Sequence, residues 1–212
     1  MKITVIAATI FEIQPSINVF SNNPVQFIVT GIGMLSTAVS LTKIVLDEKP
    51  DIVIQAGIAG CFNTEMPLGS VVVVNSETIG DLGVNENGDW QDVFDLKLVE
   101  GSSVPFTNKQ ITNPYIKQLN TLSLDEVAAI SINEVSTNQQ RIKQLQAKYN
   151  PIIESMEGAA LHYVCTDLKV PFLQLRSISN YIGERDKSKW QMKEAIANLN
   201  ETLIILLQQL LI

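Results

Sequence analysis

Short apolar runs alternate along this chain with longer segments in which apolar residues recur every three to four positions. The short runs predict buried strands, and the longer segments predict helices with one apolar face. This alternation is typical of an α/β domain. The expected strands are residues 3–7, 25–30, 51–56, 71–74, 127–131, 152–155 and 171–177, and the expected helices are residues 33–48, 139–149, 158–168 and about 190–211.

Two early segments shape the expected fold. Gly31-Ile32-Gly33 opens the first long helix, and Pro50 follows its end. Residues 57–60, Gly-Ile-Ala-Gly, predict a loop where the backbone bends sharply or approaches a ligand, which makes Gly57 a candidate substrate contact. The stripe of the first long helix that should face the sheet contains Leu35, Ala38, Val39 and Val45.

Residues 80–112 are rich in Gly, Asp and Asn and follow no clear period. A flap over an active site and an interface loop both fit this composition.

Composition limits the class of protein. The chain has 212 residues, of which 46% are hydrophobic, so we expect residues 1–212 to form one domain with a large core. Charged residues make up 17%, and the net charge is -7 with no long block of one sign. A nucleic-acid binder would present a basic face, so a small-molecule ligand is the better expectation.

The cysteines and the two chain ends indicate a cytoplasmic protein. Cys61 and Cys165 lie far apart and have no metal-ligand spacing, which predicts buried thiols of a reducing compartment. The first apolar run is too short for a signal peptide, and a carboxylate follows it at Glu12. Near the other end, the apolar residues 203–207 are far too few to span a membrane.

Polar groups lie just past several expected strands, at the edge where open α/β sheets bind ligands. A glutamate after a strand is usually a solvated loop residue, so Glu12 alone says little. An arginine that ends an apolar strand is less common, because a partly buried guanidinium needs an anion. Two carboxylates, one guanidinium and one amide on such ends predict a site for a polar ligand. The segments at these strand ends are Glu12, residues 57–60, residues 156–158 and residues 176–180.

Longer motifs resemble the superfamily of purine nucleoside phosphorylases and nucleosidases, with residues 80–125 the least informative part. The resemblance implies a three-layer α/β/α fold with a central mixed sheet, no metal or organic cofactor, and a homodimer. The motifs are residues 1–8 with Glu12, Gly31-Ile32-Gly33, Gly57-Ile58-Ala59-Gly60 with residues 68–73, Ser155-Met156-Glu157-Gly158-Ala159-Ala160, Val170-Pro171-Phe172, and Arg176-Ser177-Ile178-Ser179-Asn180.

The same resemblance implies a role for each matching residue. Glu12 is expected to be the general base that activates water at C1′, and Arg176 is expected to orient Glu12 through an ion pair. Glu157 is expected to accept hydrogen bonds from the ribose hydroxyls, with Met156 against the sugar. Asn180 is expected to bind the N7/O6 edge of the base.

Two features indicate which base the substrate carries. Nucleosidases of methylthioadenosine carry Asp where this chain has Asn180, and an amide, which both donates and accepts, favours a hypoxanthine or guanine base. Residues 180–190 resemble futalosine hydrolases, which release hypoxanthine. Arg185 or Lys187 is a candidate partner for the carboxylate of that substrate, although a solvated loop is equally compatible.

Hydrolysis is favoured over phosphorolysis because cations that could hold phosphate are scarce. Residues 9–11 contain no Arg, and Ile58 stands where phosphorylases of the superfamily have Ser. Two alternatives stay open. One is another purine nucleosidase or phosphorylase, including a methylthioadenosine/S-adenosylhomocysteine nucleosidase. The other is a non-catalytic nucleoside-binding or storage protein.

The histidine and the aromatic residues have simpler explanations than catalysis. His162 lies within an expected helix, so we interpret it as structural. Core or interface packing is the expectation for Trp90 and Trp190, as it is for Phe11 and Phe106, although each ring could stack on a ligand.

Overall fold

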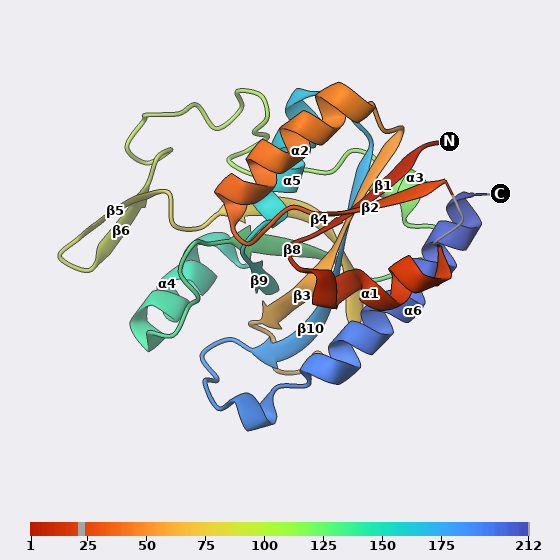
Figure 1. Cartoon of the computed structure of the whole chain (residues 1–212). Helices are drawn as coiled ribbons and strands as arrows, with labels where there is room; N and C mark the ends of the chain where they lie inside the picture. Colours follow the sequence, from red (N-terminus) through yellow and green to blue (C-terminus); the bar gives the residue numbers. More distant parts are fainter. Residues whose placement is uncertain (21–23, 212) are drawn as a thin grey trace.

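The computed structural model describes residues 1–20 and 24–211, and it has helices on both sides of a mixed sheet (Figure 1). The strands are β1 Ile3–Ala7, β2 Val25–Val29, β3 Ile52–Cys61, β4 Val71–Ile79, β5 Gly83–Glu86, β6 Asp89–Asp92, β7 Ile111–Thr112, β8 Glu126–Ser131, β9 Ile153–Ser155 and β10 Phe172–Tyr181. The helices are α1 Ile10–Val19, α2 Met34–Glu48, α3 Ile116–Leu119, α4 Gln139–Tyr149, α5 Gly158–Asp167 and α6 Met192–Leu210, with a 3-10 turn at Lys187–Lys189.

The main sheet has eight strands and closes partly on itself. Its order is β10-β4-β8-β9-β3-β1-β2, with β7 beside β4. Strand β10 also pairs with β3, so β3, β10, β4, β8 and β9 form a ring. Most of these pairings are parallel, whereas β10–β4, β3–β9 and β4–β7 are antiparallel. The expected mixed sheet is therefore confirmed, and its parallel strands bring several carboxyl ends to one edge.

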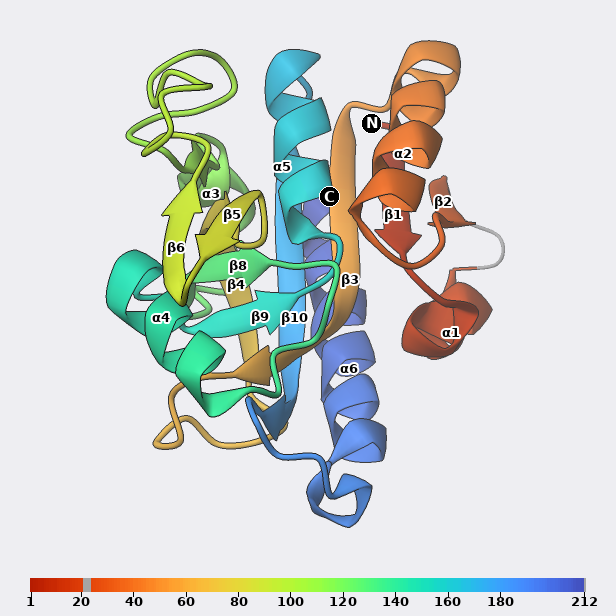
Figure 2. The same cartoon turned by 90° about the vertical axis from the view of Figure 1, so that its left-hand side faces the viewer.

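Two pairs of helices cover the sheet. Helices α1 and α6 pack on one face and α2 and α5 on the other, as Figures 1 and 2 show. The first layer buries Ile13 and Leu203 against the sheet, and the second buries Leu41 and Leu161. No helix in the described part of the chain is both long and apolar enough to cross a membrane.

The apolar stripe expected on α2 is partly wrong. Leu35 is 79% exposed and Val39 is 50% exposed, whereas Val45 is buried. The face that meets the sheet is instead formed by Thr37, Leu41, Ile44 and Val45. Helix α2 thus has a second apolar stripe that points away from the core, which a single-face interpretation of its pattern cannot separate.

Three segments differ from the expected elements. Residues 57–60, expected to be a loop, continue β3 in extended conformation, and β10 runs to Tyr181, past the expected strand end at residue 177. Near their ends both strands carry residues of the buried core, such as Cys61 and Ile178, as well as residues that line a cavity, such as Gly60 and Asn180. Helix α1 is not among the expected helices, and the spacing of Thr9 and Glu12, typical of a capping box, marks its start.

Residues 80–112, in which the sequence shows no clear period, contain the β5–β6 hairpin. This hairpin projects from the body at the left of Figure 1. Trp90 of this hairpin stacks on Arg141 of α4, 4.0 Å from the ring centroid, and donates to the Tyr149 hydroxyl. Phe106 packs edge-on against Phe94 and Tyr163. These aromatic residues are therefore packing residues.

Candidate active site

A cavity of about 490 Å³ opens where β1, β3, β9 and β10 end near the start of α1. Its size suits a small-molecule ligand. Exposed apolar side chains stand at its mouth, since Phe11 is 76% exposed and Ile32 is 64% exposed. Its wall comprises Ala8, Thr9, Phe11, Glu12, Ile32, Ile58, Ala59, Gly60, Val135, Glu154, Ser155, Met156, Glu157, Ser179, Asn180, Ile182, Trp190, Met192 and Ile196.

The structure brings four of the candidate residues together on this wall: Glu12, Met156, Glu157 and Asn180. The other candidates lie outside it: Gly57 and Arg176 are directly behind the wall, and Arg185 is on an exposed loop.

Glu12 is held by backbone and side-chain donors at the start of α1. Its Oε2 accepts from the backbone N–H and the hydroxyl of Thr9, each at 3.0 Å, and its Oε1 accepts from Ile58 N at 3.2 Å. On the other side of α1, Asn200 of α6 donates to the backbone carbonyl of Glu12. These contacts fix the carboxylate at the cavity edge although it is only 8% exposed.

Glu157 is held by the start of a different helix. It occupies the N-cap position of α5 but caps nothing there. Its Oε1 accepts from Gly33 N at 3.1 Å, at the N-terminus of α2, where the helix dipole favours a negative charge. Gly33 has φ 91°, a left-handed conformation that glycine adopts at little cost. This backbone conformation orients the N–H of Gly33 toward the Glu157 carboxylate.

Arg176 is buried behind the wall, 1% exposed. Its Nη2 donates to Gln55 Oε1 at 2.9 Å and lies 3.8 Å from Glu157 Oε2, and its Nη1 contacts the Ile58 carbonyl at 3.4 Å. The expected ion pair with Glu12 is wrong: within the described residues Arg176 pairs with Glu157. The backbone at Ile58 lies between the two groups, donating to Glu12 and accepting from Arg176.

Gly57 is needed for space. A Cβ at this position would lie 2.3 Å from Arg176 Nη1 and 2.9 Å from Glu12 Oε1. The glycine motif was expected to form a turn. It instead lies within a strand, where Gly57 leaves room for the side chains of Arg176 and Glu12.

Asn180 lies on the cavity wall near the end of β10, with its amide oriented by neighbours. Its Oδ1 accepts from the Ser179 hydroxyl at 2.8 Å, and its Nδ2 donates to the Tyr181 carbonyl at 3.2 Å. One N–H of the amide and one lone pair of Oδ1 remain for a ligand.

A buried carboxyl, that of Glu77, stabilises the first turn of α5. Glu77 of β4 is fully buried, and burial raises its pKa to about 7. It accepts from Gln174 and from Ser131, and the Ser131 hydroxyl accepts from Ala159 N in the first turn of α5. Glu77 thus supports the start of the helix that carries Glu157.

His162 is not among the described residues that line the cavity, as expected for a structural residue. It donates through Nδ1 to the Ile111 carbonyl at 2.9 Å, and burial lowers its pKa to about 4. The ring is therefore neutral at neutral pH. Cys61 and Cys165 are free and buried, which confirms the expected buried thiols.

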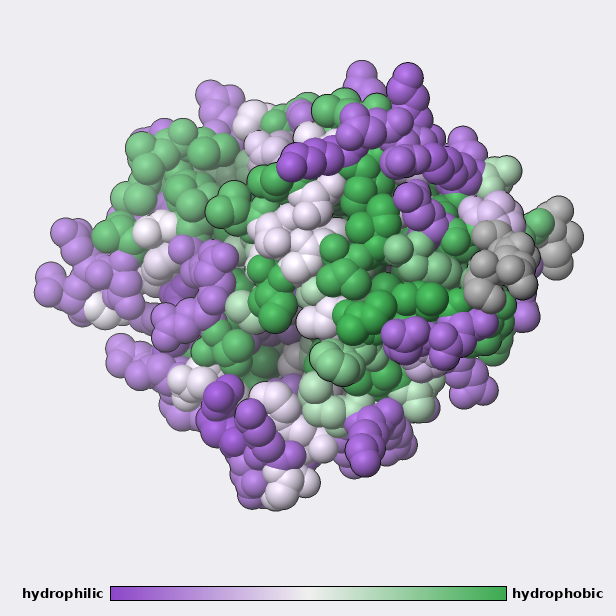
Figure 3. Space-filling model, in the orientation of Figure 1, coloured by the Kyte–Doolittle hydropathy of each residue, from purple (hydrophilic) through white to green (hydrophobic). Residues whose placement is uncertain are grey.

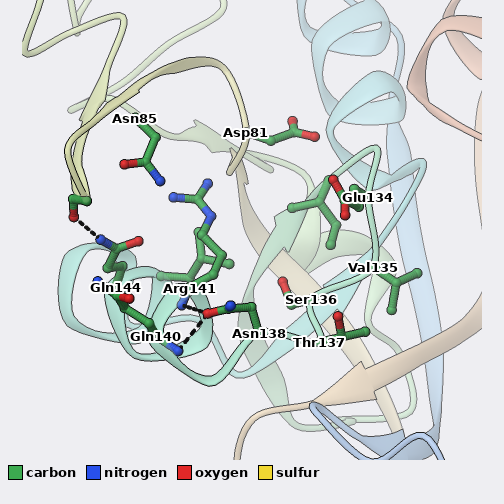
Figure 4. A pocket seen from close by; sticks show the side chains of 13 residues that line it. Asp81, Asn85, Glu134, Val135, Ser136, Thr137, Asn138, Gln140, Arg141 and Gln144 are labelled. Carbon is green, nitrogen blue, oxygen red and sulfur yellow. Dashed lines mark hydrogen bonds between the residues drawn. The ribbon is translucent and has the colours of Figure 1, made fainter.

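A second cavity, of about 350 Å³, lies on the far side of the loop that contains Val135 (Figure 4). Its lining is mainly polar, and the Arg141 side chain points toward Asn85 and Asp81 in the close-up. Asn138 caps α4 by accepting from Gln140 N and Arg141 N. Across the described residues, no group of His, Cys, Asp or Glu is arranged to hold a metal ion.

A family model described as the phosphorylase superfamily matches residues 16–211. The chain belongs to the phosphorylase superfamily. This confirms the resemblance and the α/β class expected from the sequence.

Relatives that the chain resembles include a futalosine hydrolase and a 5′-methylthioadenosine/S-adenosylhomocysteine nucleosidase. The chain is 30% identical over 171 residues to a futalosine hydrolase of Streptomyces coelicolor, covering 79% of this chain and 70% of the relative. It is 25% identical over 184 residues to a 5′-methylthioadenosine/S-adenosylhomocysteine nucleosidase of Bacillus velezensis, covering 84% and 77%. This superfamily member is thus a nucleosidase, as expected.

The fold matches solved structures over almost the whole chain. A crystal structure of the 5′-methylthioadenosine/S-adenosylhomocysteine nucleosidase from Helicobacter pylori, with butyl-thio-DADMe-Immucillin-A, superposes with a TM-score of 0.81. The match covers 99% of this chain and 98% of that one at 18% identity.

Glu154 is a wall residue that the sequence interpretation missed. It lies in the middle of an apolar strand, and a carboxylate at such a position is itself a signal, because charged residues are seldom buried without a partner.

Gly57→Ala tests the close approach behind the wall. We expect a loss of nucleosidase activity of about 100-fold, because an added methyl group displaces Arg176 and Glu12 by about an ångström. The activity is measured as purine release, with the melting temperature as a check of folding.

Gly80→Ala, away from the cavity wall, is the matched variant. Its Cβ meets the far end of the flexible Ile130 side chain, which can move aside, so a smaller loss is expected. Equal losses in the two variants would contradict the explanation for Gly57.

Proposed function

We propose that this nucleosidase is a futalosine hydrolase, which cleaves the bond between C1′ and N9 with water and releases hypoxanthine. The composition of the cavity wall carries the proposal. Within the described residues, this wall holds three carboxylates, Glu12, Glu154 and Glu157, together with the amide of Asn180, and it has no Lys or Arg.

The wall favours water over phosphate as the nucleophile. A phosphate dianion beside three carboxylates would meet like charges in a poorly solvated space, where repulsion is strong. Arg176 is behind the wall and already faces Glu157, and Ile58 offers no polar side chain. Water carries no charge and meets none of this repulsion.

The same carboxylates suit the transition state. Departure of the base develops positive charge on the ribosyl ring, and fixed anions stabilise charge that appears only at that stage. Glu12 accepts a proton from the water whose oxygen bonds to C1′. The C1′–N9 bond breaks with its electron pair on the purine, which takes a proton from solvent at N7. Glu157 binds the ribose hydroxyls, and Met156 contacts the sugar.

Asn180 supports a 6-oxopurine base. Its remaining N–H can donate to O6, and its free Oδ1 lone pair can accept from protonated N7. The outer end of the substrate carries a carboxylate, for which we propose Arg185 as the partner. Arg185 lies over the ring of Trp190, 5.9 Å from its centroid, and Trp190 lines the cavity.

A substrate panel tests the proposed function. Futalosine, methylthioadenosine, S-adenosylhomocysteine and inosine are each incubated with the protein, with and without phosphate, and the released purine is identified by chromatography. We expect hypoxanthine from futalosine at a rate independent of phosphate. Adenine from methylthioadenosine as the main product, or turnover that requires phosphate, would contradict the proposal.

Glu12→Gln tests the base. The amide keeps the size of the side chain but cannot take the proton, so kcat is expected to fall by about 10²–10⁴-fold with little change in stability. Glu201→Gln, an exposed change on α6, is the control and should keep the wild-type rate. A Glu12→Gln variant within threefold of wild type would exclude Glu12 as the base.

We also propose that the protein is a homodimer that pairs through α2. The second apolar stripe of this helix, with Leu35 and Val39, lies beside a hollow of about 360 Å³ that Leu82 and Tyr163 also line. Figure 3 shows hydrophobic residues gathered across the middle of one face of the molecule. Apolar patches of this kind are typical of interfaces between subunits.

Leu35→Glu tests the proposed interface. Sedimentation velocity of the wild type should give about twice the 23.4 kDa of one chain, and the variant should shift toward the monomer because it buries an unpaired charge. Val19→Glu, at an exposed position of α1, should not change the mass. A wild-type protein that sediments as a monomer at micromolar concentration would refute the dimer.

A further inference from the structure

Glu154 of β9 has no contact with the substrate assigned above, although it lines the cavity and is 5% exposed. Burial raises the pKa of its carboxyl because the charged form loses hydration, and hydrogen bonding to Ser136 opposes this only in part. A buried carboxyl on a ligand cavity is costly unless a donor meets it.

The two oxygens of Glu154 differ in their contacts. Oε1 accepts from Ser136 N at 3.1 Å, which anchors the carboxyl to the loop that carries Val135. Oε2 is buried and has no hydrogen-bond partner within the described residues. Glu154 lines the cavity, and the last torsion of a glutamate is broad, so its carboxyl can turn to meet a donor there. A donor is therefore missing at one oxygen only.

The sheet sets Glu154 opposite Asn180. Gly60 of β3 pairs with Glu154 on one side and with Asn180 on the other. Two strand spacings put the backbones of Glu154 and Asn180 about 9–10 Å apart. Gly60 has no side chain between them, so a flat base lying over Gly60 has Asn180 at one part of its polar edge and Glu154 at another.

We propose that Glu154 determines specificity for the base: Oε2 accepts a hydrogen bond from N1–H of a 6-oxopurine, while Asn180 binds the N7/O6 edge. This inference rests on the proposed function, whose site it completes. A 6-aminopurine has a lone pair at N1 in place of the proton. That lone pair would face a carboxylate oxygen, leaving both acceptors without a donor in a buried place.

Glu154→Gln tests this assignment because the hydrogen bond from Ser136 N fixes the orientation of the new amide group. Ser136 N must meet an acceptor, so the amide oxygen takes the place of Oε1 and Nε2 takes the place of Oε2. The NH₂ group then opposes N1–H of hypoxanthine and complements N1 of adenine. The ratio of affinities for hypoxanthine over adenine, measured by calorimetry, is expected to fall by about 100-fold.

Activity provides a second readout. The ratio of kcat/KM for futalosine over its 6-amino analogue should fall with the affinity ratio. Glu134→Gln, an exposed change on the same loop, is the matched control and should leave both ratios unchanged. Unchanged ratios in a folded Glu154→Gln variant would overturn the assignment.

Wild-type protein decides the question if the variant does not fold. Hypoxanthine methylated at N1 lacks the proposed donor and should bind at least about 10-fold more weakly than hypoxanthine, whereas equal affinity would overturn the assignment. Measured affinities for the free base also distinguish a failure of the proposed function from a failure of the role assigned to Glu154. A protein that releases no hypoxanthine from futalosine contradicts the proposed function, and one that releases it but binds hypoxanthine and its N1-methyl derivative equally contradicts only the role of Glu154.

Discussion

The need to hold one buried guanidinium determines how the candidate site is built. Arg176 cannot be buried without partners, because an unpaired charge in the interior costs several kcal/mol. The chain supplies Gln55, the Ile58 carbonyl and Glu157 as partners. Their positions fix the neighbouring structure. Residue 57 must lack a side chain, β3 must stay extended past its apolar part, and Glu157 must point back toward the sheet.

A second constraint is the repulsion among the carboxylates of the wall. Each is held by donors from a different element: Glu12 by the start of α1, Glu157 by the start of α2, and Glu154 by the loop before α4. The backbone amides are fixed before any ligand arrives, so the negative charges need no rearrangement to meet a developing positive charge. Crowding of like charges is unfavourable, and in the proposed mechanism a cationic ribosyl transition state relieves that repulsion.

The sequence predicted the elements of the fold better than the faces of those elements. Periodicity located β1, α4 and β8 within a residue or two, because their patterns end at clear turn signals. It misassigned the outer stripe of α2, since an apolar residue that packs on the core and one that lies on the surface look alike in one dimension. For the site, motif resemblance selected Glu12 and Glu157 on the wall, but the partner of Arg176 depends on strand pairing that no local pattern contains.

The position of Asn180 is an example of such non-local information. The register between β10 and β3 slips after Ile178, so that Ile178 pairs with Ala59 and Asn180 pairs with Gly60. The extra residue, Ser179, is a bulge that changes which way the following side chains point. Strict alternation would put Ile178 and Asn180 on the same face; instead Ile178 is buried in the core and Asn180 lines the cavity.

The Ser179 hydroxyl stabilises this local exception by donating to Asn180 Oδ1 at 2.8 Å, and it lies 3.3 Å from the Ala59 carbonyl. A single inserted residue, invisible in the hydrophobic pattern, therefore decides whether the amide faces the core or the cavity.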